Sequence, residues 1–162
     1  MMPGARKTFI ILRLLLGACS LQLTACDTID LYEKVVSIPK HDWQSNFKPQ
    51  FKFTIKDTNS NYQMYVILRH NEKYNYNNIY VNVSVKGPGQ DTAQKIQENL
   101  VLATNEKGWL ASGMDDIYDH RIQLGPEQSL KAGKYNFVIE QIMRENPLNN
   151  VLNVGLRIEK KQ

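Results

Sequence analysis

Residues 79–86 read Ile-Tyr-Val-Asn-Val-Ser-Val-Lys, an uninterrupted alternation of apolar and more polar side chains. Successive side chains of a β-strand point to opposite faces, so this pattern predicts a strand with one buried face and one face in solvent. The Gly87-Pro88-Gly89 segment that follows is typical of a turn. The stretch therefore indicates a sheet that covers a core on one side.

Similar patterns recur on both sides of this strand, separated by clusters of Gly, Pro and Asn that are typical of turns. Further strands are predicted over residues 51–56, 62–69, 117–124, 135–140 and 154–159. Gly125-Pro126 and Ala132-Gly133 are expected to bracket a connection after the third of these. Seven or eight strands without a long amphipathic helix predict an all-β fold, a single antiparallel β-sandwich of the jelly-roll or immunoglobulin type.

Two segments fit more than one structure. Residues 95–103 contain good helix formers, but Ile96, Leu100 and Leu102 share one parity, and we favour a strand because the neighbouring segments are strands. Residues 26–50 show little periodicity and are interpreted as a lead-in, with an edge strand over 31–38. The sandwich is then expected over residues 51–162.

The N-terminus has the pattern of an export signal. Three positive charges within residues 1–13 precede a mostly apolar uncharged run over 14–25, which is the order found in secretory signal peptides. The uncharged run is shorter than the roughly 20 residues that a membrane-spanning helix needs. We therefore expect residues 1–25 to be removed.

Leu23-Thr24-Ala25-Cys26 ends this segment and resembles a bacterial lipobox, whose cysteine is acylated and becomes the new N-terminus. Cys26 is the predicted lipid attachment site. Leu16-Gly17-Ala18-Cys19 fits as well, but cleavage there leaves a short apolar run interrupted by Arg13. A chain lipidated at Cys26 retains no free thiol, which excludes disulfides and cysteine-ligated metals from the mature protein.

The charge balance argues against nucleic-acid binding. The whole chain has 20 Lys and Arg against 16 Asp and Glu, with a pI near 9.0. The predicted signal removes three of the basic residues, which leaves 17 against 16 and a net charge of +1. No basic cluster stands out in the rest. The basicity therefore belongs to the precursor.

Few residue patterns point to catalysis. His41, His70 and His120 are far apart, and none has the spacing of a zinc-binding helix. Neither a Gly-x-Ser-x-Gly elbow nor a phosphate-binding glycine loop occurs. We therefore expect no enzyme activity, no catalytic residue, no cofactor and no metal, although a carboxylate pair assembled from distant residues remains an open alternative.

Two clusters have alternative interpretations. Asp115, Asp116 and Asp119 form either a calcium site or, as we favour, a turn with solvated carboxylates. Six aromatic residues form either a stacking platform for a glycan or, as we again favour, ordinary edge-strand and loop packing: Tyr62, Tyr65, Tyr74, Tyr76, Tyr80 and Trp109. Tyr74 and Tyr76 are the strongest candidates, because they lie in an Asn-rich loop. A row of exposed coplanar rings would indicate the glycan alternative.

The order of several motifs resembles the gliding-motility-associated lipoprotein family GldH. The matching segments are Cys26-Asp27, Tyr32-Glu33, Ile38-Pro39, Trp43, residues 51–58, the central motif at 108–121, and the closing segments at 135–144 and 154–160. The resemblance covers nearly all of the predicted mature chain. It implies a small lipoprotein associated with the outer membrane, tied to gliding and to the secretion machinery that accompanies gliding.

The resemblance also selects candidate residues for an interaction or structural role: Trp109, Asp116, Tyr118, Asp119, Arg121, Glu140 and Arg144. Trp109 and Tyr118 either pin an irregular loop to the core, as we favour, or present a contact surface. Glu140 and Arg144 lie at the end of a predicted strand, where an ion pair could lock it to a neighbour such as the strand of Arg157. The expected partners are the membrane, through the lipid, and envelope proteins.

Overall fold

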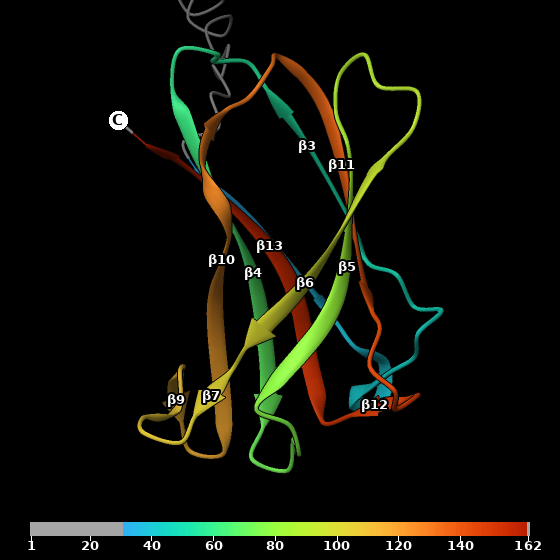
Figure 1. The fold of residues 1–162 in the computed structure, drawn as a ribbon, viewed down its shortest axis with the longest axis vertical. Coiled ribbons are helices and arrows are strands. Elements are labelled where there is room, and N and C mark those ends of the chain that lie inside the picture. Colours follow the sequence, from blue (N-terminus) through green and yellow to red (C-terminus); the bar gives the residue numbers. More distant parts are fainter. Residues whose placement is uncertain (1–30, 162) are drawn as a thin grey trace, which may run out of the picture.

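The strands of this protein form two antiparallel sheets that pack face to face (Figure 1). The structure is a computed structural model and describes residues 31–161. The predicted signal peptide, Cys19 and Cys26 lie outside the described residues. The expected all-β sandwich is confirmed.

One sheet has five strands and the other has four. The five-stranded sheet has the order β1 (Leu31–Ser37), β13 (Val151–Lys161), β4 (Asn61–Asn71), β10 (Ile117–Ser129) and β9 (Ser112–Met114). The four-stranded sheet has the order β3 (Gln50–Ile55), β11 (Gly133–Gln141), β5 (Asn78–Lys86) and β6 (Gln94–Val101). Two short ladders join β2 (Asp42–Trp43) to β12 (Leu148–Asn149) and β7 (Ala103–Thr104) to β8 (Gly108–Trp109).

The strand order is that of a jelly roll. Among the eight long strands, only β5 and β6 are neighbours both in sequence and in a sheet, and every other ladder joins distant segments. The chain places β1, β4, β10 and β13 in one sheet and β3, β5, β6 and β11 in the other. Eight strands that alternate in this way make two Greek keys, which distinguishes a jelly roll from the immunoglobulin order.

Three expectations are resolved by the ladders. Residues 94–101 pair with β5, so the choice of a strand over a helix is confirmed. The edge strand in the lead-in is also confirmed, because β1 pairs with β13 along seven residues. The expected boundary at residue 51 therefore lies inside the sandwich, since β1 and β2 precede it.

The connection expected between Gly125-Pro126 and Ala132-Gly133 is present only at residues 130–132, and its predicted start at Gly125-Pro126 is wrong. β10 continues through these residues to Ser129, and its pairing with β4 shifts register between Leu124 and Gln128. Gly125 has a φ of 61°, a conformation that glycine adopts readily. The dipeptide therefore forms an irregularity within a long strand, where two extra residues of β10 are accommodated without ending the ladder.

The core lies between the sheets and is built from the apolar parity of each strand. In β5, Ile79, Val81 and Val83 point inward and are at most 3% exposed, as the alternation predicts. Trp43 is completely buried, and its indole Nε1 donates to the Phe47 carbonyl at 2.8 Å. Each fully buried large apolar side chain contributes roughly 1.5–3 kcal/mol.

Candidate functional site

The central motif closes one end of the sandwich with aromatic rings. Trp109, in β8, packs against His70 of β4 with ring centroids 4.4 Å apart, and against Tyr118 of β10 at 5.3 Å. Tyr118 also stacks on His70 at 5.4 Å. Both motif rings are half-buried. This packing supports the interpretation that Trp109 and Tyr118 pin the segment between β7 and β10 to the core.

Two histidines form the floor of this aromatic cluster. His70 and His120 are both fully buried, and their Nε2 atoms lie 2.9 Å apart. The Nδ1 of His70 lies 2.7 Å from the Asn71 carbonyl oxygen, so Nδ1 carries the proton of the neutral ring and donates to that oxygen. His70 Nε2 then accepts a hydrogen bond from the Nε2–H of His120. The Nδ1 of His120 is buried and makes no hydrogen bond within residues 31–161.

Burial keeps this histidine pair neutral. It lowers the pKa of His70, and it lowers the pKa of His120 to about 4, where the neighbouring His70 adds to the effect. The Leu110 backbone and Asp119 oppose the shift but do not cancel it. An imidazole in an apolar site loses more hydration energy when charged than when neutral. The pair is therefore withdrawn from solvent and serves the packing of the motif.

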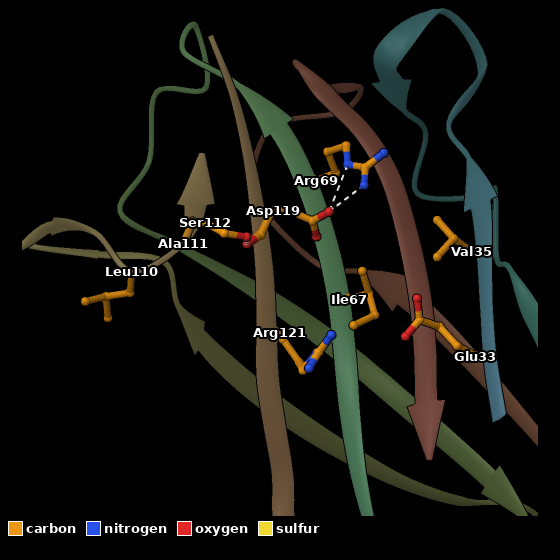
Figure 2. Close-up of a pocket in the computed structure, with 9 residues that line it drawn as sticks. All are labelled: Glu33, Val35, Ile67, Arg69, Leu110, Ala111, Ser112, Asp119 and Arg121. Carbon is orange, nitrogen blue, oxygen red and sulfur yellow. Dashed lines mark hydrogen bonds and ion pairs between the residues drawn. The ribbon is translucent and has the colours of Figure 1, made fainter. Parts of the chain in front are cut away.

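The outer face of the same sheet carries an open groove of about 580 Å³ (Figure 2). The alternation of side chains along β10 explains why the groove lies on this face. Tyr118 and His120 point into the core, whereas Asp119 and Arg121 point outward. The lining residues are Glu33, Val35, Ile67, Arg69, Leu110, Ala111, Ser112, Asp119 and Arg121. One motif therefore both closes the core and builds an external surface.

The groove contains two arginines in different electrostatic situations. Arg69 forms an ion pair with Asp119, the residue opposite it in the β4–β10 ladder, with Nε donating to Oδ2 at 3.2 Å. Arg121 lies opposite Ile67 and is exposed. It makes no ion pair with any residue of the described part of the chain. Arg121 is therefore an uncompensated positive charge beside an apolar floor.

That apolar floor depends on a close approach of three strands. Val35, Gly155 and Ile67 are in register across β1, β13 and β4. A Cβ on Gly155 would lie 3.0 Å from Val35 Cγ2 and 3.1 Å from Ile67 Cβ. Glycine therefore lets the two side chains cover β13, and the groove presents apolar surface next to Arg121.

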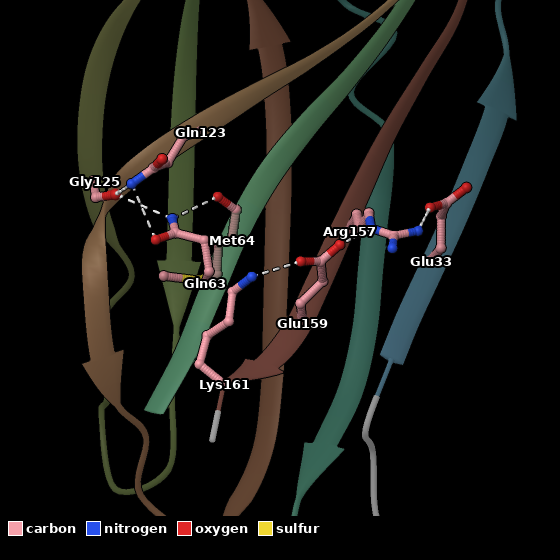
Figure 3. A network of polar contacts seen from close by, with 8 residues as sticks. All are labelled: Glu33, Gln63, Met64, Gln123, Gly125, Arg157, Glu159 and Lys161. Carbon is pink, nitrogen blue, oxygen red and sulfur yellow. Dashed lines mark hydrogen bonds and ion pairs between the residues drawn. The ribbon is translucent and has the colours of Figure 1, made fainter. Parts of the chain in front are cut away.

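A charged network borders the groove towards the other end of the sheet (Figure 3). Arg157 donates to Glu33 at 2.5 Å and to Glu159 at 2.6 Å, and Lys161 donates to Glu159 at 2.9 Å. The hydrogen bonds from Lys161 and Arg157 lower the pKa of Glu159 to about 2. These charges are mutually compensated, which leaves Arg121 as the group open to an external anion.

The expected ion pair between Glu140 and the strand of Arg157 is wrong. Glu140 binds Lys48 at 2.7 Å and Lys95 at 3.6 Å, and the hydrogen bond to Lys48 chiefly lowers its pKa. The physical reason is that β11 and β13 belong to different sheets, and both side chains point away from the core. Each therefore pairs with a residue of its own outer face.

The remaining candidate residues lie apart from the groove. Asp116 is exposed, and its carbonyl accepts a hydrogen bond from the Glu72 amide at 2.8 Å, which ties the β9–β10 turn to the end of β4. Arg144 is exposed on the far side, beside a second open pocket over β5 and β6. Glu140 in β11 and Arg144 in the segment after β11 therefore lie on the side of the four-stranded sheet.

The calcium alternative for the acidic cluster finds no geometric support. Asp119 pairs with Arg69, whereas Asp115 has a φ of 57° in the turn before β10. Among residues 31–161, three or more His, Cys, Asp or Glu side chains do not gather anywhere as a metal site would need.

The alternative of a glycan platform over Tyr74, Tyr76 and Trp109 is not supported, because these rings do not form a row of exposed coplanar surfaces. Tyr74 is 3% exposed, and its ring meets Tyr76 edge-on at an interplanar angle of 68°. Trp109 belongs to the histidine cluster instead. Packing within the protein therefore accounts for the positions of Tyr74 and Trp109. Of these three rings, only Tyr76 is exposed on the surface.

Sequence reasoning missed the part of the groove that lies outside the central motif. Arg69, Ile67, Val35 and Glu33 come from β4 and β1, at least about 40 residues away along the chain. Arg69 carries one available signal, since it is the charged residue in a strand that is otherwise largely apolar. The other three residues have no signal that separates them from ordinary strand positions.

Known proteins with similar sequences indicate the family of this chain. The sequence model of the GldH lipoprotein family matches residues 30–158. The chain is 26% identical over 146 residues to the gliding motility lipoprotein GldH homolog of Christiangramia forsetii, covering 85% of this chain and 88% of the relative. It is 27% identical over 146 residues to the gliding motility lipoprotein GldH of Flavobacterium johnsoniae, covering 86% and 90%.

Among solved structures, latent PorU of Porphyromonas gingivalis aligns with a TM-score of 0.37 and 9% identity, over 82% of this chain and 13% of that one. A structural similarity this low does not support a statement about the function of this chain. No helix within residues 31–161 is long and apolar enough to cross a membrane. The family match extends over most of the sandwich, including the groove and the central motif. The chain belongs to the GldH lipoprotein family.

Proposed function

We propose that this protein is a lipid-anchored, non-enzymatic lipoprotein of the outer membrane that acts as an accessory component of the gliding motility machinery and its associated secretion apparatus. The names of both relatives support the link to gliding. The lipobox at Cys26 supports the anchor. In this role the sandwich binds an envelope protein through the groove on the five-stranded sheet.

The observation that carries the proposal is the composition of the groove. Five of its nine lining residues come from the segment 110–121, which belongs to the central motif. The unpaired Arg121 lies beside Ile67 and Val35, so the groove suits an extended protein segment with a carboxylate next to apolar side chains. A charge-assisted bond to an arginine is stronger than a neutral hydrogen bond and gives the segment its register.

The positions of the titratable groups favour binding over catalysis. His70 and His120 are enclosed behind Trp109 and Tyr118. Asp119 in the groove is engaged by Arg69. A general acid or base must reach its substrate within hydrogen-bond distance, and buried imidazoles do not. The groove instead offers fixed charges and apolar surface, which are the elements of a protein interface.

Crosslinking in intact cells tests the proposal. A photoreactive amino acid at the exposed Leu110 is expected to crosslink this lipoprotein to a defined envelope protein of a gliding host whose own gene is deleted. Arg121→Glu is expected to abolish that crosslink and to reduce colony spreading, because it repels the carboxylate. The Lys52→Glu variant makes the same change of charge at an exposed position of β3, in the other sheet, and serves as the matched control.

Two outcomes overturn the groove as the binding surface. One is an unchanged crosslink and unchanged spreading in Arg121→Glu at normal protein levels. The other is loss of both in Lys52→Glu while Arg121→Glu retains them. Circular dichroism of the purified variants checks that each remains folded.

A further inference from the structure

A second open pocket, of about 520 Å³, lies on the outer face of the four-stranded sheet. It is formed by the start of β5, the adjacent part of β6 and the segment 142–144 that follows β11. It shares no lining residue with the groove, because the two surfaces belong to different sheets. Any ligand here therefore binds independently of the proposed protein partner.

Two exposed tyrosine rings line this pocket. Tyr80 points outward from β5 and is 40% exposed, and its hydroxyl has no partner among the described residues. Tyr76 is 37% exposed, and its hydroxyl donates to Glu145 Oε2 at 2.7 Å. That bond and the edge contact with buried Tyr74, 5.8 Å between centroids, hold the Tyr76 ring in place. Flat apolar surface is thus presented in a fixed position.

Neutral amides and one arginine surround the rings. The side-chain amide of Asn78 donates to Asn99 Oδ1 at 2.7 Å. The side-chain oxygen of Asn78, Oδ1, accepts no hydrogen bond within residues 31–161. Gln97 is exposed on β6 and lies in register with Asn82 of β5. Arg144 is exposed and makes no ion pair with a described residue. These groups supply both donors and acceptors around an aromatic surface.

The wall of the pocket is held rigidly against β5. The Ile142 amide donates to the Tyr80 carbonyl at 3.0 Å, and the Met143 amide donates to Gln141 Oε1 at 2.8 Å. Gln141 is itself buried and donates to the Trp43 carbonyl at 3.1 Å. A preformed wall reduces the ordering cost of binding.

We propose that this pocket binds an oligosaccharide. A pyranose has an apolar face of C–H groups and an edge of hydroxyls, and the pocket has the complementary arrangement. Tyr80 and Tyr76 stack on sugar faces, whereas Asn78, Gln97 and Arg144 exchange hydrogen bonds with the hydroxyls. Two exposed tyrosine rings surrounded by amides and a single arginine suit this ligand better than an acidic protein segment, which would need positive charge along its length.

Isothermal titration of the detergent-solubilised lipoprotein tests the proposal. The probes are cellohexaose, mannohexaose, xylohexaose, chitohexaose and a guluronate hexamer, with a proline-rich decapeptide as the competing class. Binding of at least one sugar is expected. Tyr80→Ala should weaken it at least about tenfold, and Arg144→Ala about fivefold. Tyr80→Phe should retain most of the affinity, because it keeps the ring.

Arg121→Glu is the matched control for this experiment, since it lies in the groove and should leave sugar binding unchanged. The proposal is overturned if none of the sugars binds, if only the peptide binds, or if Tyr80→Ala leaves the affinity for the sugar unchanged. None of these results bears on the envelope crosslink at position 110. Failure of this site and failure of the groove are therefore distinguishable.

Discussion

At the scale of single residues, the segment Tyr118-Asp119-His120-Arg121 has two functions. Tyr118 and His120 point into the aromatic cluster, whereas Asp119 and Arg121 point into the groove. The two-residue period of a strand separates these functions with no additional structure. A substitution at an inner position is therefore expected to act on stability, and a substitution at an outer position on binding.

The buried histidine pair predicts a specific pH dependence of stability. Above the ordinary histidine pKa near 6.5, the ring of His120 is neutral in both the folded and the unfolded chain. As the pH falls from 6.5 to about 4, the unfolded chain gains protons that the folded chain excludes. The free energy of unfolding should therefore decrease across this window, by about 3 kcal/mol for His120 alone.

Urea unfolding at a series of pH values measures this effect. His120→Gln should reduce the slope between pH 6.5 and 4, whereas His41→Gln, at an exposed position, should retain it. A stability that stays constant down to pH 4 would contradict the assignment. The carboxyl of Glu159, with a pKa lowered to about 2, should lose its contribution only below about pH 4.5.

The lipid anchor is also a single-residue prediction. Cys26→Ala should abolish incorporation of labelled palmitate, because the thiol is the group that forms the bond to the lipid. Cys19→Ala, within the predicted signal peptide, should leave labelling intact and is the matched control. Metabolic labelling followed by membrane fractionation measures both variants. Normal labelling of Cys26→Ala would refute the assignment and indicate Cys19.

At the scale of elements, a close approach between strands shapes the groove. Gly155 of β13 is flanked by β1 and β4, and a Cβ at this position would lie 2.8 Å from the Lys34 carbonyl oxygen. That oxygen belongs to the backbone and cannot move without shifting β1. A glycine is thus required by the packing of three strands, and it allows Val35 and Ile67 to meet above it.

Gly155→Ala should accordingly destabilise the protein by about 1–3 kcal/mol, the usual cost of forcing an extra methyl into a packed site. Chemical denaturation measures the loss. Gly113→Ala is a suitable control, because its Cβ would lie 3.4 Å from Tyr118 Cδ1, an ordinary contact, and it should cost less. Equal effects of the two substitutions would contradict the role given to Gly155.

At the scale of the whole molecule, the sandwich separates two candidate surfaces on opposite sheets. The groove contains the unpaired Arg121, and the second pocket contains Tyr76, Tyr80 and Arg144. The net charge of the predicted mature chain is only +1. Arg121 is therefore a local feature of the groove and no part of a generally basic surface.

The ladder between β1 and β13 makes the lead-in part of the sandwich. Deletion of residues 27–37 should lower the free energy of unfolding by about 3 kcal/mol or more, because it exposes β13 and removes Tyr32 from its contact with Phe53 at 5.3 Å. Deletion of residues 27–30 is the control. Equal thermal melting of the two truncated proteins would restore residue 51 as the start of the domain.

Particular elements show why some expectations were correct. The strands over 79–86 and 135–140 were predictable because burial of one face imposes a two-residue period on the sequence. The choice between strand and helix at 95–103 was also correct. The prediction that a connection starts at Gly125-Pro126 was wrong, because this dipeptide occurs both in turns and in irregular strands. The pairing of β10 with β4 determines which of the two forms here.

The amino-acid order alone was enough to identify the class of fold, the buried parity of strands such as β5 and β11, and the resemblance to the GldH family, and it predicts the export signal, because all of these depend on local order along the chain. The three-dimensional structure was needed for the jelly-roll pairing, the position of β1, the partners of Glu140 and Arg157, and the composition of both candidate surfaces. The physical reason is that pairing brings together residues such as Arg69 and Asp119, 50 positions apart. Local alternation is the same whichever strand lies alongside.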